Sequence, residues 1–258
     1  MQPTLFLSHG SPMMPLEDIP ARAFIASLGQ RLERPKAILL VSAHWDNDVP
    51  TLTAAQDLDT IHDFYGFPPA LYALSYPAHG APELAETIAD LLGDAGLRAH
   101  TDATRGLDHG AWVPLMLMYP QADVPVIQLS IQSRLGPGHH IQLGRALAAL
   151  REQNVLIIAS GGFTHNLRAL HRHGPAGEEP QWASEFSDWM HHALTAGRTC
   201  DLVSYRRLAP HAAMAHPTDE HLLPLFVALG AAGPDAKATR LHSSATLGAL
   251  RLDAYAFN

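Results

Sequence analysis

Histidines that follow short apolar segments are the residues of this sequence best suited to chemistry. The chain has 17 histidines, as many as its Lys and Arg residues together. His9 follows the apolar run TLFLS, His44 follows AILLVSA, and His165 comes shortly after VLIIAS. If these runs are parallel strands, their carboxyl ends meet at the edge of the sheet where ligands bind in open α/β folds. Because imidazole nitrogens are common metal ligands, the pattern predicts a metal site at that edge.

A simpler interpretation competes with this one. A single histidine after a strand is more often a hydrogen-bonded loop residue than a ligand, and 17 histidines produce some coincidences. Three such placements favour the metal site. The sequence contains neither HExxH nor the Cys/His spacing of a zinc finger, and its one cysteine, Cys200, excludes a thiolate cluster and an internal disulfide. The ligands must therefore come from distant parts of the chain.

Two other segments concentrate polar residues. GLDHGAW, at residues 106–112, places His109 directly after Asp108 and before a helix-like apolar run. The alternative there is a helix capped by Asp108 with an exposed histidine. HPTDEHLLP, at residues 216–224, supplies four further candidate ligands, namely His216, Asp219, Glu220 and His221. This segment could equally be an ordinary helix start, capped by one of its own polar residues.

The elements that must position these residues alternate along the chain. Short runs rich in Val, Ile and Leu predict buried strands at residues 4–8, 37–42, 124–130 and 155–160. Amphipathic spacing predicts helices at residues 82–95, 137–152, 182–194 and 220–229, and a final strand pair at 245–255. The alternation predicts an α/β three-layer sandwich around a central, largely parallel or mixed sheet. Residues 172–180 read as a loop, and we expect one domain over residues 1–258.

Composition excludes several classes of protein. Only 16% of the residues are charged and 47% are hydrophobic, which excludes a disordered chain. The formal net charge of −8 argues against binding to a nucleic-acid backbone. No apolar stretch reaches the roughly 20 residues of a membrane helix, and the first residues, MQPTLFLSHG, show no secretory signal. We therefore expect a soluble, cytoplasmic protein that contacts neither nucleic acid nor membrane.

Taken together, the polar segments resemble a known family. The matching segments are SHGSPM (8–13), SAHW (42–45), TIHDFYGFP (60–68), GLDHGAW (106–112), THNL (164–167) and HPTDEHLLPL (216–225). In this order they resemble the bacterial 4,5-DOPA extradiol dioxygenase family, which belongs to the class III, protocatechuate 4,5-dioxygenase type of ring-cleavage enzymes. The resemblance implies an α/β fold, a mononuclear non-haem iron(II), and opening of a small catechol by O2. Zinc also occupies the metal position in structures of the family.

The resemblance also implies roles for single residues. His9, His44 and His221 match the metal ligands. The histidine that matches His165 lies at the metal, either as a fourth ligand or as an acid/base group, and His109 matches an active-site histidine beside the metal.

Two residues of the last segment match the family less closely. The position of His216 is not always histidine in the family, which argues against His216 as a ligand. Other enzymes of the class use a carboxylate as third ligand, which leaves Glu220 as an alternative to His221.

These roles suit the chemistry of a catechol. A metal-bound catechol hydroxyl has a lowered pKa, and neutral His165 can take the released proton. An N–H group of His109 can stabilise the negative charge that develops on oxygen. The loop at residues 61–68, with His62, Tyr65 and Phe67, could form an aromatic wall for a flat substrate or simply fill the core.

Two other functions are compatible with the residues alone. A zinc-dependent hydrolase would use the same histidines to hold a metal-bound hydroxide. A non-enzymatic metal-binding protein would need a closed set of ligands and neither His165 nor His109 as an acid/base pair.

Overall fold

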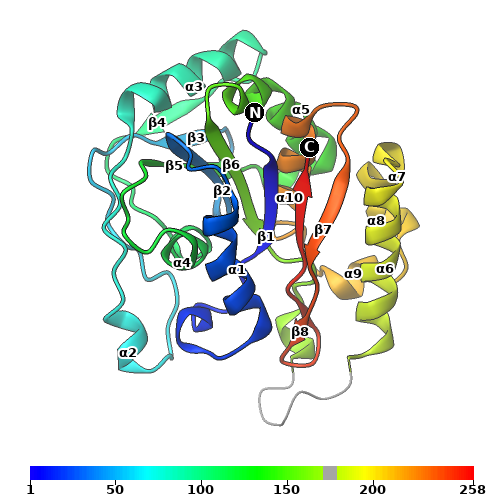
Figure 1. Cartoon of the computed structure of the whole chain (residues 1–258). Helices are drawn as coiled ribbons and strands as arrows, with labels where there is room; N and C mark the ends of the chain where they lie inside the picture. The colour runs from blue at the N-terminus through cyan, green and yellow to red at the C-terminus, as the bar shows by residue number, and fades with distance from the viewer. Residues whose placement is uncertain (171–178) are drawn as a thin grey trace.

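A computed structural model describes residues 1–170 and 179–258 of the chain (Figure 1). Most of the loop predicted at residues 172–180 lies outside the described residues. No helix in the described ranges is both long enough and apolar enough to span a membrane.

The centre of the fold is an eight-stranded mixed sheet with the order β4-β3-β5-β2-β6-β1-β10-β7. Its strands are β1 (Thr4–Ser8), β2 (Ala37–Asp46), β3 (Thr51–Thr53), β4 (His100–Asp102), β5 (Val126–Ile131), β6 (Val155–Gly161), β7 (Ala238–His242) and β10 (Ala254–Phe257). The four middle strands, β5, β2, β6 and β1, are parallel, whereas β3 and β10 join them antiparallel. A small second sheet pairs β8 (Ala245–Thr246) with β9 (Leu250–Arg251).

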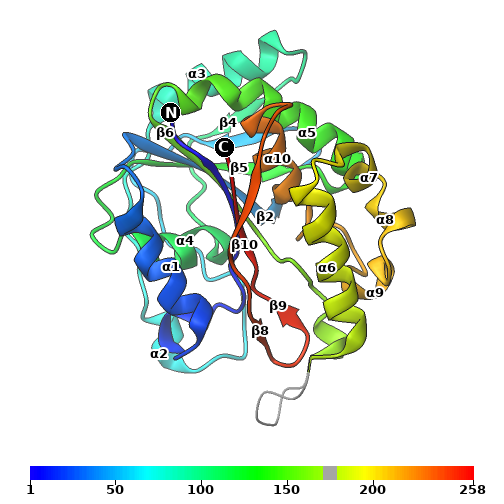
Figure 2. The same cartoon turned by 45° about the vertical axis from the view of Figure 1, so that its right-hand side comes forward.

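Helices cover both faces of the sheet. They are α1 (Pro20–Arg31), α2 (Pro69–Tyr72), α3 (Pro82–Asp94), α4 (His109–Met118), α5 (Gly136–Leu147), α6 (Gln181–Thr195), α7 (Thr199–Val203), α8 (Tyr205–Leu208), α9 (Ala212–Ala215) and α10 (Leu223–Ala232). Short 3-10 turns cover Met14–Leu16, Ser133–Leu135, Ala148–Arg151 and Leu167–Ala169. Figures 1 and 2 show α1 and α4 on one side of the sheet and α5 and α10 on the other.

The two faces follow from the alternation of side chains along each strand. On β1, Leu5 and Leu7 point into the core beneath α1 and α4, whereas Phe6 points into the core beneath α3, α5 and α10. Every residue of β1, β5 and β6 is buried, as expected for strands covered on both faces. The predicted three-layer α/β sandwich with a mixed sheet is confirmed.

Several element boundaries differ from the prediction; β2, for example, runs to Asp46 rather than ending at residue 42, so His44 lies within it. The helix predicted at 137–152 is α5 followed by a 3-10 turn. The helix predicted to start at residue 220 begins at Leu223, because the residues before it form turns. The final strand pair at 245–255 is wrong in part: β8 and β9 do pair, but β10 joins the main sheet beside β1.

The sheet brings the predicted site residues to one edge. His9 directly follows β1, His44 lies near the end of β2, and β6, which lies between these two strands, ends at Gly161. Because all three strands run parallel, their carboxyl ends lie side by side. The segment before α10 then crosses the end of β6 and carries His221 to the same edge.

That crossing has no room for a side chain at Gly161. The amide of Gly162 donates a hydrogen bond to the carbonyl oxygen of His221 at 2.9 Å. A Cβ atom on Gly161 would lie 2.1 Å from that same oxygen, which is far inside van der Waals contact. Glycine at this position therefore sets how closely the His221 segment approaches the sheet.

We expect Gly161→Ala to push the His221 segment off β6 and to lower the free energy of unfolding by about 1–3 kcal/mol, the usual cost of overpacking. Gly162→Ala is the matched control, since its Cβ would have no neighbour closer than 3.4 Å. Urea denaturation of both variants measures the difference. Equal stabilities would show that the crossing is not tightly constrained.

Candidate active site

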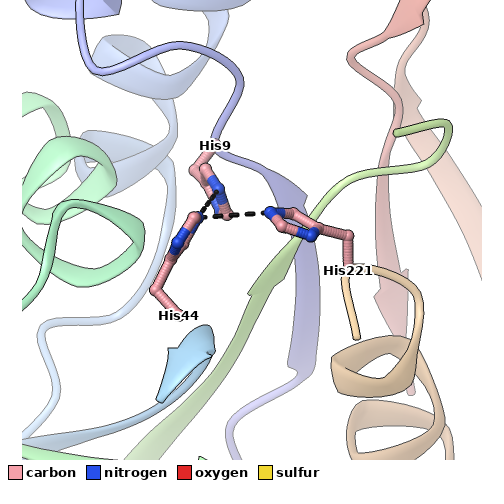
Figure 3. A group of neighbouring side chains, drawn as sticks. All are labelled: His9, His44 and His221. Atoms are coloured by element: carbon pink, nitrogen blue, oxygen red, sulfur yellow. Dashed lines mark hydrogen bonds between the residues drawn. The ribbon is translucent and has the colours of Figure 1, made fainter. Parts of the chain in front are cut away.

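Three imidazoles meet at the carboxyl edge of the sheet. The Nε2 atoms of His9 and His44 are 3.0 Å apart, and those of His44 and His221 are 3.2 Å apart. Figure 3 shows the three rings pointing toward one another from separate segments of the chain. The structure thus brings together the three residues predicted as metal ligands, in a group whose ligand atoms could hold one metal ion.

The other nitrogen of two of these rings has a partner that fixes the tautomer. Nδ1 of His221 lies 3.1 Å from a carboxylate oxygen of Glu220, which can only accept a hydrogen bond. Nδ1 of His9 lies 3.0 Å from the hydroxyl of Ser160, which donates its own proton to the carbonyl of Gly110. Both Nδ1 atoms therefore carry the hydrogen, and both Nε2 atoms present a lone pair to the cluster. This is the arrangement that metal-binding histidines adopt.

Burial keeps the three imidazoles neutral. Desolvation lowers the pKa of His9 and of His221 well below its ordinary value, and the neighbouring imidazoles lower it further. Burial likewise lowers the pKa of His44 to about 3, with the ring of His109 as the next cause. Neutral imidazole is the form that binds a metal ion, so the cluster needs no deprotonation at neutral pH.

His165 lies against the cluster on the side of His221. The two rings stack with their centroids 3.3 Å apart and their planes 10° from parallel. The amide of His165 donates to the carbonyl of Ala215 at 2.8 Å, which ties the loop after β6 to the end of α9. Burial lowers the pKa of His165 to about 4, so this ring too is neutral at neutral pH.

His109 lies on the opposite side, at the start of α4. Its ring centroid is 3.9 Å from that of His44 and 5.3 Å from that of His9. Asp63 accepts hydrogen bonds from its backbone amide at 3.0 Å and from its Nδ1 at 2.9 Å. Burial alone would raise the pKa of Asp63, but these bonds outweigh it and lower the pKa to about 2. The structure therefore brings all five predicted site histidines into one group.

Asp108 does not cap helix α4, and His109 is only 6% exposed, so the alternative of a capped helix with an exposed histidine is wrong. The Asp108 carboxylate instead accepts hydrogen bonds from the hydroxyl of Ser42 at 2.6 Å and from the amide of Gln128, and it pairs with Arg105 at 3.1 Å. Burial raises the pKa of Asp108. This buried network anchors the start of α4 to β2 and β5.

His216 lies outside the group of five. Its Nε2 atom is 3.0 Å from the carbonyl oxygen of Phe163, and its ring packs against Phe186 in the core. This placement agrees with the inference that His216 is not a ligand. Its contact joins the segment before α10 to the loop after β6, and it thereby helps to hold His221 beside His165.

The aromatic loop reaches the site through a residue that the sequence analysis did not name. Phe64, rather than Tyr65 or Phe67, has its ring 5.8 Å from that of His109. Tyr65 is 92% exposed. His62 is bound by its Nε2 to the carbonyl of Leu74 at 3.0 Å. The loop thus fills part of the core, as one of the two interpretations has it, and places the Phe64 ring beside His109.

Sequence reasoning missed Asp63, Ser160 and the Asp108 network. Asp63 and His109 are separated by 46 residues, and His9 and Ser160 by 151, so no local spacing relates them. A weak signal existed for Ser160, which ends the apolar run VLIIAS as Ser42 ends AILLVS and Ser8 ends TLFLS.

Known proteins resemble this chain along nearly its whole length. The profile of the family described as "Catalytic LigB subunit of aromatic ring-opening dioxygenase" matches residues 3–256. A "4,5-DOPA dioxygenase extradiol" of Beta vulgaris is 47% identical, over 98% of this chain and 96% of that protein. One of the same name from Mirabilis jalapa is 44% identical, over 95% and 92%. The crystal structure of an uncharacterized protein of Escherichia coli K12 superposes with a TM-score of 0.82, 35% identity and 99% coverage of both chains.

Proposed function

Since the chain belongs to the family of the catalytic LigB subunit of aromatic ring-opening dioxygenases, we propose that it cleaves a catechol ring beside its two hydroxyl groups, with O2 as oxidant. Relatives that share 47% and 44% of their residues with it are named 4,5-DOPA dioxygenases, so DOPA is the first substrate to test. The observation that carries the proposal is the convergence of three neutral imidazoles with two further histidines beside them.

The donor set fits a divalent metal ion. His9 and His221 each present a lone pair at Nε2, because their Nδ1 hydrogens are already bound, and His44 faces both. His9, His44 and His221 would hold an iron(II) ion, and a set of three protein ligands would leave room for substrate and O2. When bound, the iron supplies a Lewis acid for the catechol hydroxyls and a path for electrons from the ring to O2.

The chain's own residues bind the substrate and move its protons. His165, neutral and stacked on His221, accepts the proton of a catechol hydroxyl that approaches the cluster. His109, on the other side of His44, can take up a proton at Nε2, because Asp63 holds its Nδ1 hydrogen, and in that form it stabilises negative charge on the oxygen and can return the proton. Phe64 gives the flat ring an apolar surface beside His109. The two histidines thus flank the cluster, each with a separate proton-transfer task.

We also propose that the chain is a single domain. Residues 1–258 form one catalytic domain, which is supported by a family match over residues 3–256 and by one sheet that holds the site. The cytoplasmic location stays a prediction from the sequence.

We expect His9→Ala, His44→Ala and His221→Ala each to abolish tight metal binding, because each removes one converging lone pair. Metal content after dialysis against a weak chelator measures this. His79→Ala is the control: this exposed imidazole pairs with Asp57 away from the cluster and its loss should leave a full equivalent of metal bound. Glu220→Ala tests the alternative ligand. Metal retained by His221→Ala but lost by Glu220→Ala would make Glu220 the third ligand.

We expect His109→Ala and His165→Ala to fold and to lose turnover by roughly 10²–10⁴-fold, the usual contribution of an acid/base group. Oxygen uptake with DOPA measures turnover, and circular dichroism checks the fold. Full metal occupancy in His165→Ala would identify His165 as an acid/base group, whereas weakened binding would identify it as a fourth ligand. Wild-type rates in both variants would contradict these roles.

We expect the iron(II) form to cleave catechol and the zinc form to be inactive, because zinc has no accessible redox change. Imidazoles bind zinc at least as tightly as iron(II), so protein purified in air should contain zinc until iron is restored anaerobically. The rival zinc hydrolase predicts the opposite, namely ester hydrolysis by the zinc form and no gain from iron. Comparing both metal forms on DOPA and on simple esters separates the two functions.

A further inference from the structure

We infer that Asp63 is a positioning residue that fixes the orientation and the tautomer of His109. This inference rests on the proposed function, in which His109 acts on the substrate. It concerns a carboxylate of the aromatic loop, a segment that carries none of the five histidines.

One carboxylate oxygen of Asp63 accepts two hydrogen bonds from His109. Oδ1 accepts a hydrogen bond from the backbone amide of His109 at 3.0 Å and from its Nδ1 at 2.9 Å. A carboxylate has no hydrogen to donate, so Nδ1 of His109 must carry the hydrogen. Nε2 is then the nitrogen left free for the reacting atoms. The second oxygen of Asp63 is 3.6 Å from Nδ1 of His44, beyond hydrogen-bond distance.

The loop that carries Asp63 is itself held in place on both sides. The amide of Ile61 donates to the carbonyl of Leu107 at 2.8 Å, and the indole of Trp112 donates to the carbonyl of Ile61 at 3.0 Å. On the far side of Asp63, Phe64 packs against Trp112. Since Trp112 and His109 lie on one turn of α4, the helix and the loop fix one another.

The partial burial of Asp63 suits a residue that positions His109. Its side chain is 23% exposed, and the oxygen that faces His109 accepts two hydrogen bonds from that residue. A comparable pair on the surface, Asp57 with His79 at 2.9 Å, has both side chains more than 70% exposed. The surface pair provides a matched control, because it has the same chemistry without the site.

Asp63→Ala, Asp63→Asn and Asp57→Ala in the iron-loaded protein test the inference. Loss of an outer partner of an active-site histidine typically costs 10–100-fold, so we expect about this loss of kcat in Asp63→Ala, with KM little changed. Asp63→Asn keeps an oxygen in the place of Oδ1 and should recover most of that loss. Asp57→Ala should keep the wild-type kcat. If Asp63→Asn is as slow as Asp63→Ala, or if Asp63→Ala keeps its rate, the inference is wrong.

A double variant shows whether Asp63 acts through His109. In a His109→Ala background, Asp63→Ala should lower kcat no further, because effects of a coupled pair are not additive. A second loss of the same size would overturn the inference.

Nitrogen-15 NMR of the zinc-loaded protein tests the tautomer without any turnover. We expect the His109 ring to carry its hydrogen on Nδ1 in the wild type and to populate both tautomers in Asp63→Ala. An unchanged tautomer in Asp63→Ala would overturn the inference. Absence of catechol cleavage in the wild type would instead refute the proposed function, while the NMR result for Asp63 would still stand.

Discussion

The structure depends on keeping three neutral imidazole nitrogens in contact at the edge of a sheet. The Nε2 atoms of His9 and His221 both face that of His44, at 3.0 and 3.2 Å. The hydrogens of the first two rings are held at Nδ1 by Ser160 and Glu220. In the absence of a cation, His44 could share at most one hydrogen between its two neighbours. The arrangement is therefore unfavourable by itself, and a bound cation would stabilise it.

Rigid surroundings maintain this unfavourable contact. The hydroxyl of Ser160, on β6, links His9 to the carbonyl of Gly110, at the start of α4. A Cβ atom on Gly110 would lie 2.5 Å from the hydroxyl of Ser42, so α4 can approach β2 this closely only with glycine there. Asp108, held by Ser42 and Gln128, fixes the same helix end. The supports of the cluster are therefore connected to one another as well as to the ligands.

The sequence alone predicts the part of the site that follows from regular structure. His9 and His44 could be identified because apolar runs predict strands, and the carboxyl ends of parallel strands share one edge. His221 required the family resemblance, because from the residues alone its segment could equally be an ordinary helix start. Asp63 and Phe64 could not be assigned, since their contacts depend on how an irregular loop packs against α4. The pairing of β10 with β1 could not be assigned either, because it joins residues far apart in the chain.

The wide separation of the converging residues has a consequence for how the protein matures. His9 and His44 lie in the first fifth of the chain, whereas His221 lies in the last fifth. Contacts between such distant residues form late, because closing a long loop costs entropy before the contact repays it. A chain synthesised only as far as β6 has His9 and His44 but lacks His221, the third proposed ligand. Tight metal binding would therefore report that the whole chain has folded.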